Sequence, residues 1–586
     1  MAKEVLRIAN CSGFYGDRLS AAREMVEGGP IDVLTGDYLA ELTLMILFKD
    51  RQKNPQAGYA RTFLRQMEEV LGTCVERGIK VVANAGGLNP AGLAQQMCEL
   101  AHRLGLRVRI AHIEGDDLLP RLNELQAEGH EFRHLDKGIP LRELQAQVVT
   151  ANAYLGGWGI AEALRRGADV VICPRVTDAA LVVGPAAWHF NWSREDWDRL
   201  AAAVVAGHII ECGAQCTGGN YSFFREVPDI ERIGFPIAEM YPDGSFVITK
   251  HPGTGGLVST DTVLAQLLYE IQGPRYLNPD VTARFDTISL SQEGEHRVRV
   301  TGVRGEPPPA TTKVCINYLG GYRNSVTFVL TGLDIEEKAE VAEKTLWSLV
   351  GGKERFAEVH VDLIRWDRPN PRRNEEAFAY LTIAVKDPDP SKVGRAFTNK
   401  AIEMALANYP GFFVTSPPTD ASPYGVFWPT VIPSSLVPHR VVLEGETIDV
   451  PPVESAAAPK VEPPPVHLPP PPEGEVVQAP LGLIAGARSG DKGGNANVGL
   501  WTRQPEAYSW LREYLTTERF RELVPEARPL EIERYEFPNL RALNFVVRGL
   551  LGDGVAASTR MDPQAKSLGE YVRAKLVEIP RALLPQ

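Results

Sequence analysis

The strongest constraint on the fold is an alternation of short apolar runs with helical patterns in the first part of the chain. Strands that are apolar on both faces and separated by helices are typical of a parallel sheet covered on both sides. The sequence therefore predicts an α/β fold with a doubly wound, mostly parallel sheet. The six apolar runs lie at residues 4–10, 31–36, 79–87, 106–115, 148–157 and 168–175.

Polar or glycine-rich segments follow all six runs. Ligands of open α/β sheets bind outside the carboxyl ends of the strands, so we expect these segments to line one site for a small molecule. The alternative is that the same residues only cap helices, which Asp, Ser, Thr and Asn do routinely. The residues expected to contact the ligand are Ser12, Gly13, Asn84, Gly86, Gly87, Asn152 and Tyr154.

Four carboxyl groups and one guanidinium group at these strand ends are candidates for catalysis. They are Asp37, Asp116, Asp117, Asp178 and Arg175. A carboxylate beside Arg175 would stay ionised, whereas a buried one away from charge would have a raised pKa suited to general acid–base chemistry. We therefore expect Asp37→Asn and Asp178→Asn to abolish turnover.

The nucleotide-binding fingerprints do not occur in this sequence. Residues 12–16 read SGFYG rather than G-x-G-x-x-G, and there is no G-x-x-x-x-G-K-[ST]. Asn84 and the N–H groups of Gly86 and Gly87 are instead placed to stabilise an oxyanion near a helix N-terminus. We identify no cofactor from the sequence.

The second half of the chain changes in texture. From residue 324 the order of predicted elements is β-α-β-β-α-β, which is the ferredoxin-like arrangement. Residues 451–480 are rich in proline and predict an extended linker. We expect an α/β domain with the ligand site, an α+β split-βαβ domain, a linker and a small C-terminal α+β ferredoxin-like domain, at residues 1–282, 283–445, 446–480 and 481–586.

A glycine-rich segment, HPGTGGLVSTD at residues 251–261, precedes a predicted helix. Backbone N–H groups ahead of a helix N-terminus suit an anion, which makes Gly255 and Gly256 candidate ligand contacts. The alternative is that Ser259 or Thr260 only caps the helix.

A second glycine-rich segment, ARSGDKGGNANVGL at residues 487–500, lies between two predicted strands. In one interpretation it is a lid whose side chains reach a phosphate or carboxylate in the N-terminal site. In the other it is a hairpin in which Asp491 and Asn495 make turn hydrogen bonds. The ligand contacts expected from the first interpretation are Arg488, Ser489, Lys492 and Asn495.

Cysteine usage favours neither a disulfide framework nor a metal site. The seven cysteines are scattered and odd in number. His208, Cys212 and Cys216 have a spacing that suits half of a zinc site, but no second pair of suitable spacing follows. We therefore expect buried structural cysteines and no bound metal, with a nucleophilic Cys212 or Cys216 as a further alternative.

Charge and hydropathy exclude two classes of partner. The formal net charge is -12, whereas a nucleic-acid partner requires a basic face. No apolar run approaches the ~20 residues that span a bilayer, and the N-terminus lacks the apolar core of a signal peptide. We expect a cytoplasmic protein that binds a small molecule. We also expect a homo-oligomer, because homo-oligomers are frequent among soluble proteins.

Several motifs make the chain resemble the acyclic terpene utilisation protein A (AtuA) family. Residues 1–440 are similar to the long N-terminal domain of that family, and the end of the chain resembles its C-terminal ferredoxin-fold-like domain. The resemblance implies an association with bacterial breakdown of citronellol and geraniol through branched acyl-CoA intermediates. It rests on NCSGFYGDR, GPIDVLTGDYLAELTL, NAGGLNP, ANAYLGGWGI, PRVTDAALVVGP, RSGDKGGNANVG and NFVVRGLLGDG.

Three functional hypotheses follow. The first is an acyl-CoA lyase or hydratase, in which carboxyl groups act as acid and base, glycine N–H groups bind the enolate oxygen, and basic loop residues bind the phosphates of a CoA thioester. The second is a non-enzymatic ligand-binding or scaffold protein of a catabolic pathway. The third is a hydrolase, which the absence of a G-x-S-x-G elbow disfavours.

Overall fold

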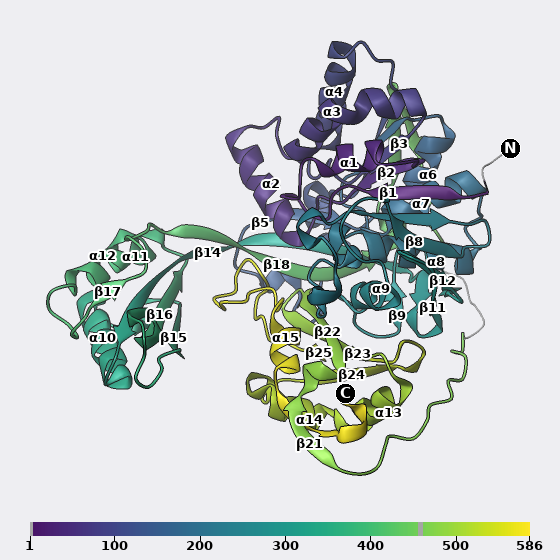
Figure 1. Ribbon diagram of the computed structural model, residues 1–586. Helices are drawn as coiled ribbons and strands as arrows, with labels where there is room; N and C mark the ends of the chain where they lie inside the picture. The colour runs from purple at the N-terminus through teal and green to yellow at the C-terminus, as the bar shows by residue number, and fades with distance from the viewer. Residues whose placement is uncertain (1–3, 455–460, 586) are drawn as a thin grey trace. The chain divides into compact units, whose positions relative to one another are not determined.

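The computed structural model describes residues 4–454 and 461–585, and its elements are labelled in Figure 1. Residues 455–460 of the predicted linker lie outside the described residues. The chain divides into two compact units. The larger unit comprises Met1–Asn317, Phe427–Val555 and Asp562–Gln586, and the smaller comprises Tyr318–Val426 and Ala556–Met561.

The larger unit is built on an eleven-stranded sheet whose centre is parallel. The parallel strands lie in the order β1, β2, β3, β6, β4, with bounds Leu6–Asn10, Val33–Gly36, Lys80–Ala83, Val170–Ile172 and Ile110–Glu114. Antiparallel strands extend both edges. Beyond β1 are β7 (Pro236–Met240), β8 (Phe246–Lys250), β12 (Arg297–Thr301) and β11 (Ser289–Gly294), and beyond β4 are β19 (Arg440–Leu443) and β20 (Glu446–Asp449).

Two hydrophobic cores cover the two faces of this sheet. Successive strand residues point to opposite faces, so Ile8 of β1 belongs to one core and Ala9 to the other. One core is completed by α6 (Trp158–Arg165), α7 (Ala180–Phe190), α8 (Trp197–Ile210) and α9 (Thr260–Leu267), and the other by α1 (Ala21–Glu27), α3 (Arg61–Arg77) and α4 (Pro90–Arg103). This arrangement can be followed in Figure 1. It explains why the strands are apolar on both faces.

One predicted member of the parallel sheet lies elsewhere. The strand at residues 148–157 is present as β5 (Val148–Ala153), but it pairs with β14 (Thr311–Thr331) and not with a parallel strand. The prediction was wrong because an apolar run shows that a strand is buried but does not show which strand it pairs with. Two further helices of this unit are α2 (Glu41–Lys53) and α5 (Leu122–Ala127).

The C-terminal part of the larger unit has its own core and an antiparallel sheet of order β22, β23, β25, β24. These strands are Ala485–Lys492, Asn495–Thr502, Ala542–Val547 and Ile532–Phe537. The helices are α13 (Pro505–Tyr514), α14 (Thr517–Leu523) and α15 (Leu568–Arg573), and β21 (Val476–Pro480) pairs with β26 (Leu576–Pro580). A small sheet of β13 (Arg304–Glu306), β10 (Thr282–Arg284) and β9 (Arg275–Leu277) completes the unit.

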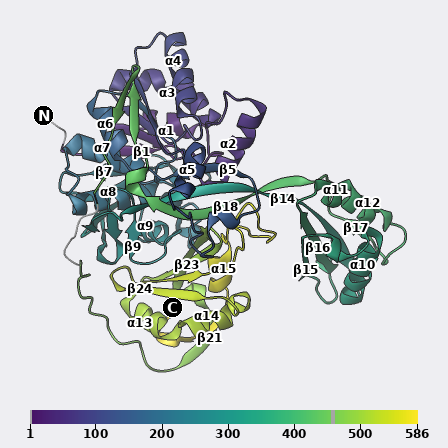
Figure 2. The ribbon, with the colours of Figure 1, turned by 180° about the vertical axis from the view of Figure 1, so that it is seen from behind.

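The smaller unit has the β-α-β-β-α-β order that the sequence predicts. Its sheet has the order β15, β16, β14, β17, and β18 (Ser422–Pro433) also pairs with β14. Its helices pack on one face of the sheet, as Figure 2 shows. The new elements are β15 (Glu358–Arg365), β16 (Phe378–Asp387), β17 (Phe413–Val414), α10 (Ile335–Val350), α11 (Pro390–Val393) and α12 (Arg395–Glu403). None of the helices in the described ranges is both long and apolar enough to cross a membrane.

Candidate active site

The carboxyl ends of β2 and β3 bring Asp37 and Asn84 into contact. The Asn84 side chain is fully buried, and its Nδ2 donates a hydrogen bond to Oδ1 of Asp37 at 2.6 Å. Oδ1 of Asn84 accepts a hydrogen bond from the N–H of Tyr38 at 2.7 Å. Because the amide is held at both ends, the Asp37 carboxyl group has a defined position at the strand ends.

Arg175, which follows β6, is the positive centre of this region. Its Nη1 donates to Oδ1 of Asp178 at 2.9 Å and to the carbonyl oxygen of Leu39 at 3.2 Å. The guanidinium carbon lies 4.3 Å from the centre of the Tyr154 ring. The Nε–H of Arg175 is buried and has no hydrogen-bond partner within the described residues. A buried donor left unpaired costs about 1–3 kcal/mol, so this group is suited to a ligand.

Glu41, in the first turn of α2, is the ionised carboxylate of the region. Its Oε1 accepts hydrogen bonds from the Tyr154 hydroxyl at 2.6 Å and from Nζ of Lys313 at 3.2 Å. Burial acts to raise the pKa of Glu41, but the charges of Lys313 and Arg175 outweigh it and hold the pKa well below its usual range. About a third of the Glu41 and Lys313 side chains remains exposed, at 30% and 38%, so a ligand can reach them.

Two other carboxyl groups have the opposite shift. Burial and the negative charge of Asp178 raise the pKa of Asp37 well above its usual range, against the charge of Arg175 and the hydrogen bond from Asn84. Burial and Asp178 also raise the pKa of Glu211, at the end of α8. These environments favour the protonated form of Asp37 and Glu211. Ionised and protonated carboxyl groups therefore lie around one guanidinium group.

The C-terminal sheet adds charged groups through the β22–β23 hairpin. Nζ of Lys492 donates to the carbonyl oxygen of Glu270 at 2.9 Å. Nζ of Lys566 lies 3.4 Å from Oε1 of Glu270 and 3.8 Å from Oδ1 of Asp491. Burial and the charge of Glu41 raise the pKa of Asp491 to about 7. We call Asp37, Glu41, Arg175, Asp178, Glu211, Glu270, Lys313, Asp491, Lys492 and Lys566 the charged cluster.

Asp116 and Asn152, two of the predicted site residues, form a separate buried pair. Oδ2 of Asp116 accepts a hydrogen bond from Nδ2 of Asn152 at 2.8 Å and from the main-chain N–H of Arg175 at 3.2 Å. Burial raises the pKa of Asp116 to about 7, and the Asn152 hydrogen bond opposes the shift. Asp117 accepts a hydrogen bond from the N–H of Leu119 at 3.0 Å. These contacts join β4, β5 and the loop after β6.

The hydrogen-bond donors of Ser12, Gly13, Gly86 and Gly87, which we predicted to contact a ligand, are bonded to other groups of the protein. The Ser12 hydroxyl donates to the carbonyl oxygen of Phe14, and the N–H of Gly13 donates to Asp17. The N–H of Gly86 donates to the carbonyl oxygen of Cys173 at 3.0 Å, and that of Gly87 to the carbonyl oxygen of Asn84. The glycines allow close approach: a Cβ on Gly86 would lie 2.7 Å from the Cys173 oxygen.

The segment at residues 251–261 is closed by its own hydrogen bonds. The N–H groups of Gly255 and Gly256 donate to the carbonyl oxygens of Arg232 and Pro228, at 2.9 and 2.8 Å. Ser259 caps α9, because its hydroxyl accepts from the N–H of Thr262. The capping alternative is therefore confirmed, and the two glycines lie outside the charged cluster.

The segment at residues 487–500 forms the β22–β23 hairpin, so the hairpin alternative is confirmed for its backbone. The Arg488 guanidinium bonds to Gln215 and to the carbonyl oxygen of Gly219. The Ser489 hydroxyl donates to the carbonyl oxygen of Ala565. Asn495 donates to Asp136 and accepts from the N–H of Gly549. Of the four side chains predicted here to bind a ligand, only Lys492 joins the charged cluster.

His208 and the nearby cysteines are packed side chains. Burial lowers the pKa of His208 to about 4, and its ring centre lies 5.1 Å from that of Tyr276. Burial raises the pKa of the Cys212 and Cys216 thiols, which disfavours the thiolate. All seven cysteines are free thiols. In residues 4–454 and 461–585, no group of three His, Cys, Asp or Glu side chains is arranged to hold a metal ion.

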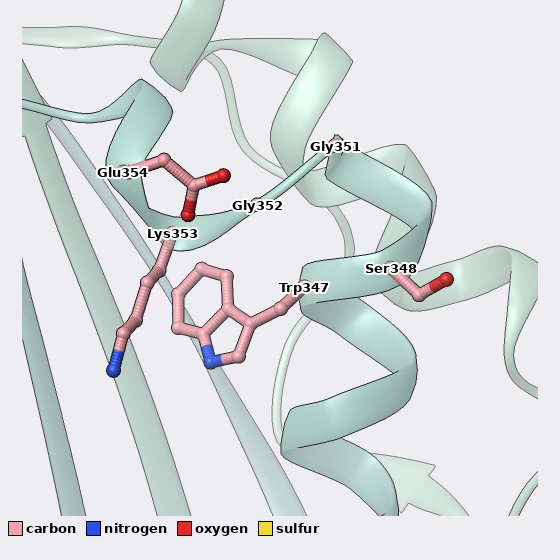
Figure 3. Close-up of a pocket in the computed structure, with 6 residues that line it drawn as sticks. All are labelled: Trp347, Ser348, Gly351, Gly352, Lys353 and Glu354. Atoms are coloured by element: carbon pink, nitrogen blue, oxygen red, sulfur yellow. The ribbon is translucent and has the colours of Figure 1, made fainter.

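Two surface hollows share no residue with the charged cluster. One is in the smaller unit, where the Trp347 ring lies beside the turn at residues 351–354 and Ser348 points away from it (Figure 3). The other lies in the larger unit, beside the N-terminus of α9. The charged residues of the first hollow, Lys353 and Glu354, are exposed and not buried. We therefore place the candidate site at the charged cluster.

Sequence reasoning did not select Glu41 or Asp491 as site residues, and it missed four further members of the cluster altogether: Glu211, Glu270, Lys313 and Lys566. They lie at the end of α8, after α9, in β14 and before α15. None of them follows a parallel strand, and no motif surrounds them. Only the neighbourhood of Glu211 carried a signal, because it lies between His208 and Cys212.

Two family models match the chain. The model described as acyclic terpene utilisation family protein AtuA matches residues 6–443, and the AtuA ferredoxin-like domain matches residues 479–578. The first match covers well over half of the chain, so the protein belongs to the AtuA family of acyclic terpene utilisation proteins. Family membership supports a role in acyclic terpene utilisation. No curated protein and no solved structure matches the chain.

Proposed function

We propose that this protein is an enzyme that performs acid–base chemistry of the lyase or hydratase type on a CoA thioester of an acyclic terpenoid or branched-chain acid. One observation carries the proposal. Around Arg175, Glu41 has its pKa shifted well below the usual range and Asp37 has its pKa shifted well above it. When the environments of two neighbouring carboxyl groups shift their pKa values in opposite directions, the group with the lower pKa is assigned as the base and the group with the higher pKa as the acid.

The geometry supports a role for each group. Glu41, which is ionised, is the base that removes a proton from the carbon or hydroxyl group next to the reacting bond. Asp37, which holds a proton, donates it to the leaving hydroxide in a hydratase step or to the enolate carbon in a lyase step. The unpaired Nε–H of Arg175 is a donor for the thioester enolate oxygen. It takes the role first expected of Gly86, whose N–H is already bonded to Cys173.

The lysines of the cluster support an anionic substrate. Lys313 forms an ion pair with Glu41, Nζ of Lys566 lies 3.4 Å from Oε1 of Glu270, and both lysines keep about 40% of their side chains exposed. Ammonium groups with solvent access attract phosphate or carboxylate groups of a ligand, and this attraction weakens as salt rises.

The test is exchange of the substrate α-proton in deuterated water. Wild type is incubated with a short acyl-CoA, a branched terpenoid acyl-CoA, free CoA and NAD, and binding is measured calorimetrically in the same buffers. We expect thioester binding and exchange in wild type. Glu41→Gln should still bind the thioester, but it should exchange the α-proton at least about 100-fold more slowly than wild type, because it lacks the base. Exchange at the wild-type rate in Glu41→Gln would remove this site from consideration.

One observation favours a non-enzymatic alternative. The smaller unit exposes large apolar side chains, including Leu333, Trp366 and Leu406, and exposed apolar groups of this kind suit a partner protein. A scaffold protein would bind its partner through these groups and would leave every thioester chemically unchanged. Binding of a thioester without exchange or product in any buffer would favour this alternative.

A further inference from the structure

Three lysines reach the charged cluster, and they differ in their partners. Nζ of Lys313 lies 3.2 Å from a carboxylate oxygen of Glu41, and Nζ of Lys566 lies 3.4 Å from one of Glu270. Lys492 instead donates to a main-chain carbonyl oxygen. Within the described residues, no carboxylate oxygen lies at ion-pair distance from its Nζ. Of the three, Lys492 is therefore the lysine whose Nζ is held by a main-chain carbonyl oxygen and not by a carboxyl group.

The surroundings of Lys492 favour its neutral amine. Burial and the positive charge of Lys313 lower the pKa of Lys492, while Glu270, Glu41 and Glu211 oppose this shift. The opposition is weakened because Glu270 and Glu211 themselves have raised pKa values and favour their neutral forms. Desolvation and a neighbouring cation are the two means by which proteins activate a lysine as a nucleophile.

The backbone holds the Lys492 side chain in a defined place. Lys492 pairs with Asn495 across the hairpin, and Gly493 has a φ of 63°, which a glycine adopts without strain. The carbonyl oxygen of Gly494 accepts a hydrogen bond from the N–H of Leu551 at 2.9 Å. The turn is thus fixed to the rest of the C-terminal sheet, and the partly exposed Lys492 side chain remains accessible to a ligand.

We propose that Lys492 is a nucleophilic amine that forms an imine with the ketone carbonyl of a β-keto acyl substrate at the charged cluster. This inference rests on the proposed function, because it assigns the substrate class of the same site. The amine nitrogen forms a bond to the ketone carbon, and the carbonyl electrons move to oxygen. Two protons, one from the amine and one from a neighbouring carboxyl group, leave with that oxygen as water. The product is the protonated imine, whose nitrogen keeps one N–H, and the carboxyl group is left as a carboxylate.

The neighbours of Lys492 suit this step. Glu211 is buried, and its Oε2 has no hydrogen-bond partner in the part of the chain that the structure describes. Its protonated form is therefore a proton source for the departing water. A protonated imine accepts electrons when an adjacent C–C or C–H bond breaks, which is the bond type that a lyase cleaves. The arrangement links the C-terminal hairpin to chemistry at the ends of the parallel strands.

The experiment traps the imine. Wild-type protein is incubated with acetoacetyl-CoA and cyanoborohydride, digested, and analysed by mass spectrometry to locate the reduced adduct. We expect modification of Lys492 in wild type and in Lys353→Met, a control at an exposed lysine outside the charged cluster, and at least a tenfold loss of adduct in Lys492→Met. Adduct formation at other lysines only, or no adduct at all, would overturn the proposal. Mapping in wild type decides the question even where a variant fails to fold.

The two proposals fail separately. Proton exchange that depends on Glu41, in a protein that gives no adduct at Lys492, would retain the acid–base function and reject the imine. An adduct at Lys492 without exchange in any thioester would retain the amine and reject the acid–base assignment.

Discussion

Asp37 and Asp116 occupy equivalent places at the ends of β2 and β4, and each is held by a buried asparagine. The hydrogen bonds are 2.6 Å from Asn84 and 2.8 Å from Asn152. Burial raises both pKa values. The difference lies in the other neighbours. Asp37 faces the charged side chains of Asp178, Arg175 and Glu211, whereas Asp116 faces main-chain N–H of Arg175 and the adjacent Asp117.

Arg175 contacts both regions through different groups. Its guanidinium group donates a hydrogen bond to Asp178, in the charged cluster that contains Asp37, and its main-chain N–H donates one to Asp116. A buried carboxyl group beside ionisable side chains can exchange protons with a ligand. Both aspartates accept a hydrogen bond from an amide and one from a main-chain N–H, and these bonds join loops together. Neither the raised pKa nor these hydrogen bonds separate the two roles, but the charged neighbours of Asp37 do.

The largest expected effect separates the two aspartates in the exchange assay. Asp37→Asn removes the proton donor but keeps the shape, so we expect a rate loss of about 100- to 10,000-fold. Asp116→Asn should stay within about threefold of wild type. The comparison would fail if both variants lost activity to the same extent while circular dichroism showed both to be folded.

The next effect is on stability against pH. Folding raises the pKa of Asp116 from 3.8 to about 7. The folded state therefore binds the proton more tightly, so the contribution of Asp116 to stability is fully present below about pH 4 and is lost as the pH rises to about 7. This contribution has a slope of about 1.4 kcal/mol per pH unit over the window. Asp116→Asn should reduce the pH dependence of stability by this amount and melt at a higher temperature than wild type at pH 8. An unchanged slope in thermal denaturation between pH 4 and pH 8 would show that Asp116 is not protonated on folding.

Substitution of the two asparagines, Asn84 and Asn152, is expected to have a smaller effect, which differs between them in exchange rate but not in stability. Asn84→Ala should lower the exchange rate about 10- to 100-fold, because the Asp37 carboxyl loses its orientation. Asn152→Ala should leave the rate nearly unchanged. Each variant should lose about 1–3 kcal/mol of stability, since a buried group is left without its partner. Chemical denaturation and exchange measured on the same samples would separate the two outcomes; equal rates in both would contradict the assignment.

The smallest effect is expected at Asp117. Its carboxyl group accepts a hydrogen bond from the N–H of Leu119, and the residue is exposed. Asp117→Asn keeps an oxygen acceptor, so we expect a stability change below about 1 kcal/mol and wild-type exchange. A rate loss in this variant would return Asp117 to the group of catalytic candidates and would place the active region nearer to β4.

Much of the site was predictable because it lies at strand ends. The alternation of apolar runs predicted the parallel strands, and the rule for ligands of open sheets predicted Asp37, Asn84, Arg175 and Asp178. The same rule also selected Ser12, Gly86 and Asp116, whose polar groups are bonded within the protein. Sequence position shows that a polar group lies at the sheet edge, but it does not show whether that group already has a partner.

The α/β class and the ferredoxin-like order from residue 324 were predictable from the sequence, and the family motifs can be read in it, because each depends on neighbouring residues or on a local period. The capped start of α9 was only one of two alternatives until the structure showed it. Packing of the folded chain, in contrast, pairs β5 with β14, places Lys313, Glu211 and Glu270 near Lys492, and brings Lys566 beside Glu270. Those residues are far apart in the chain and share no period. Their protonation states depend on burial and on charges that only the packed chain brings together.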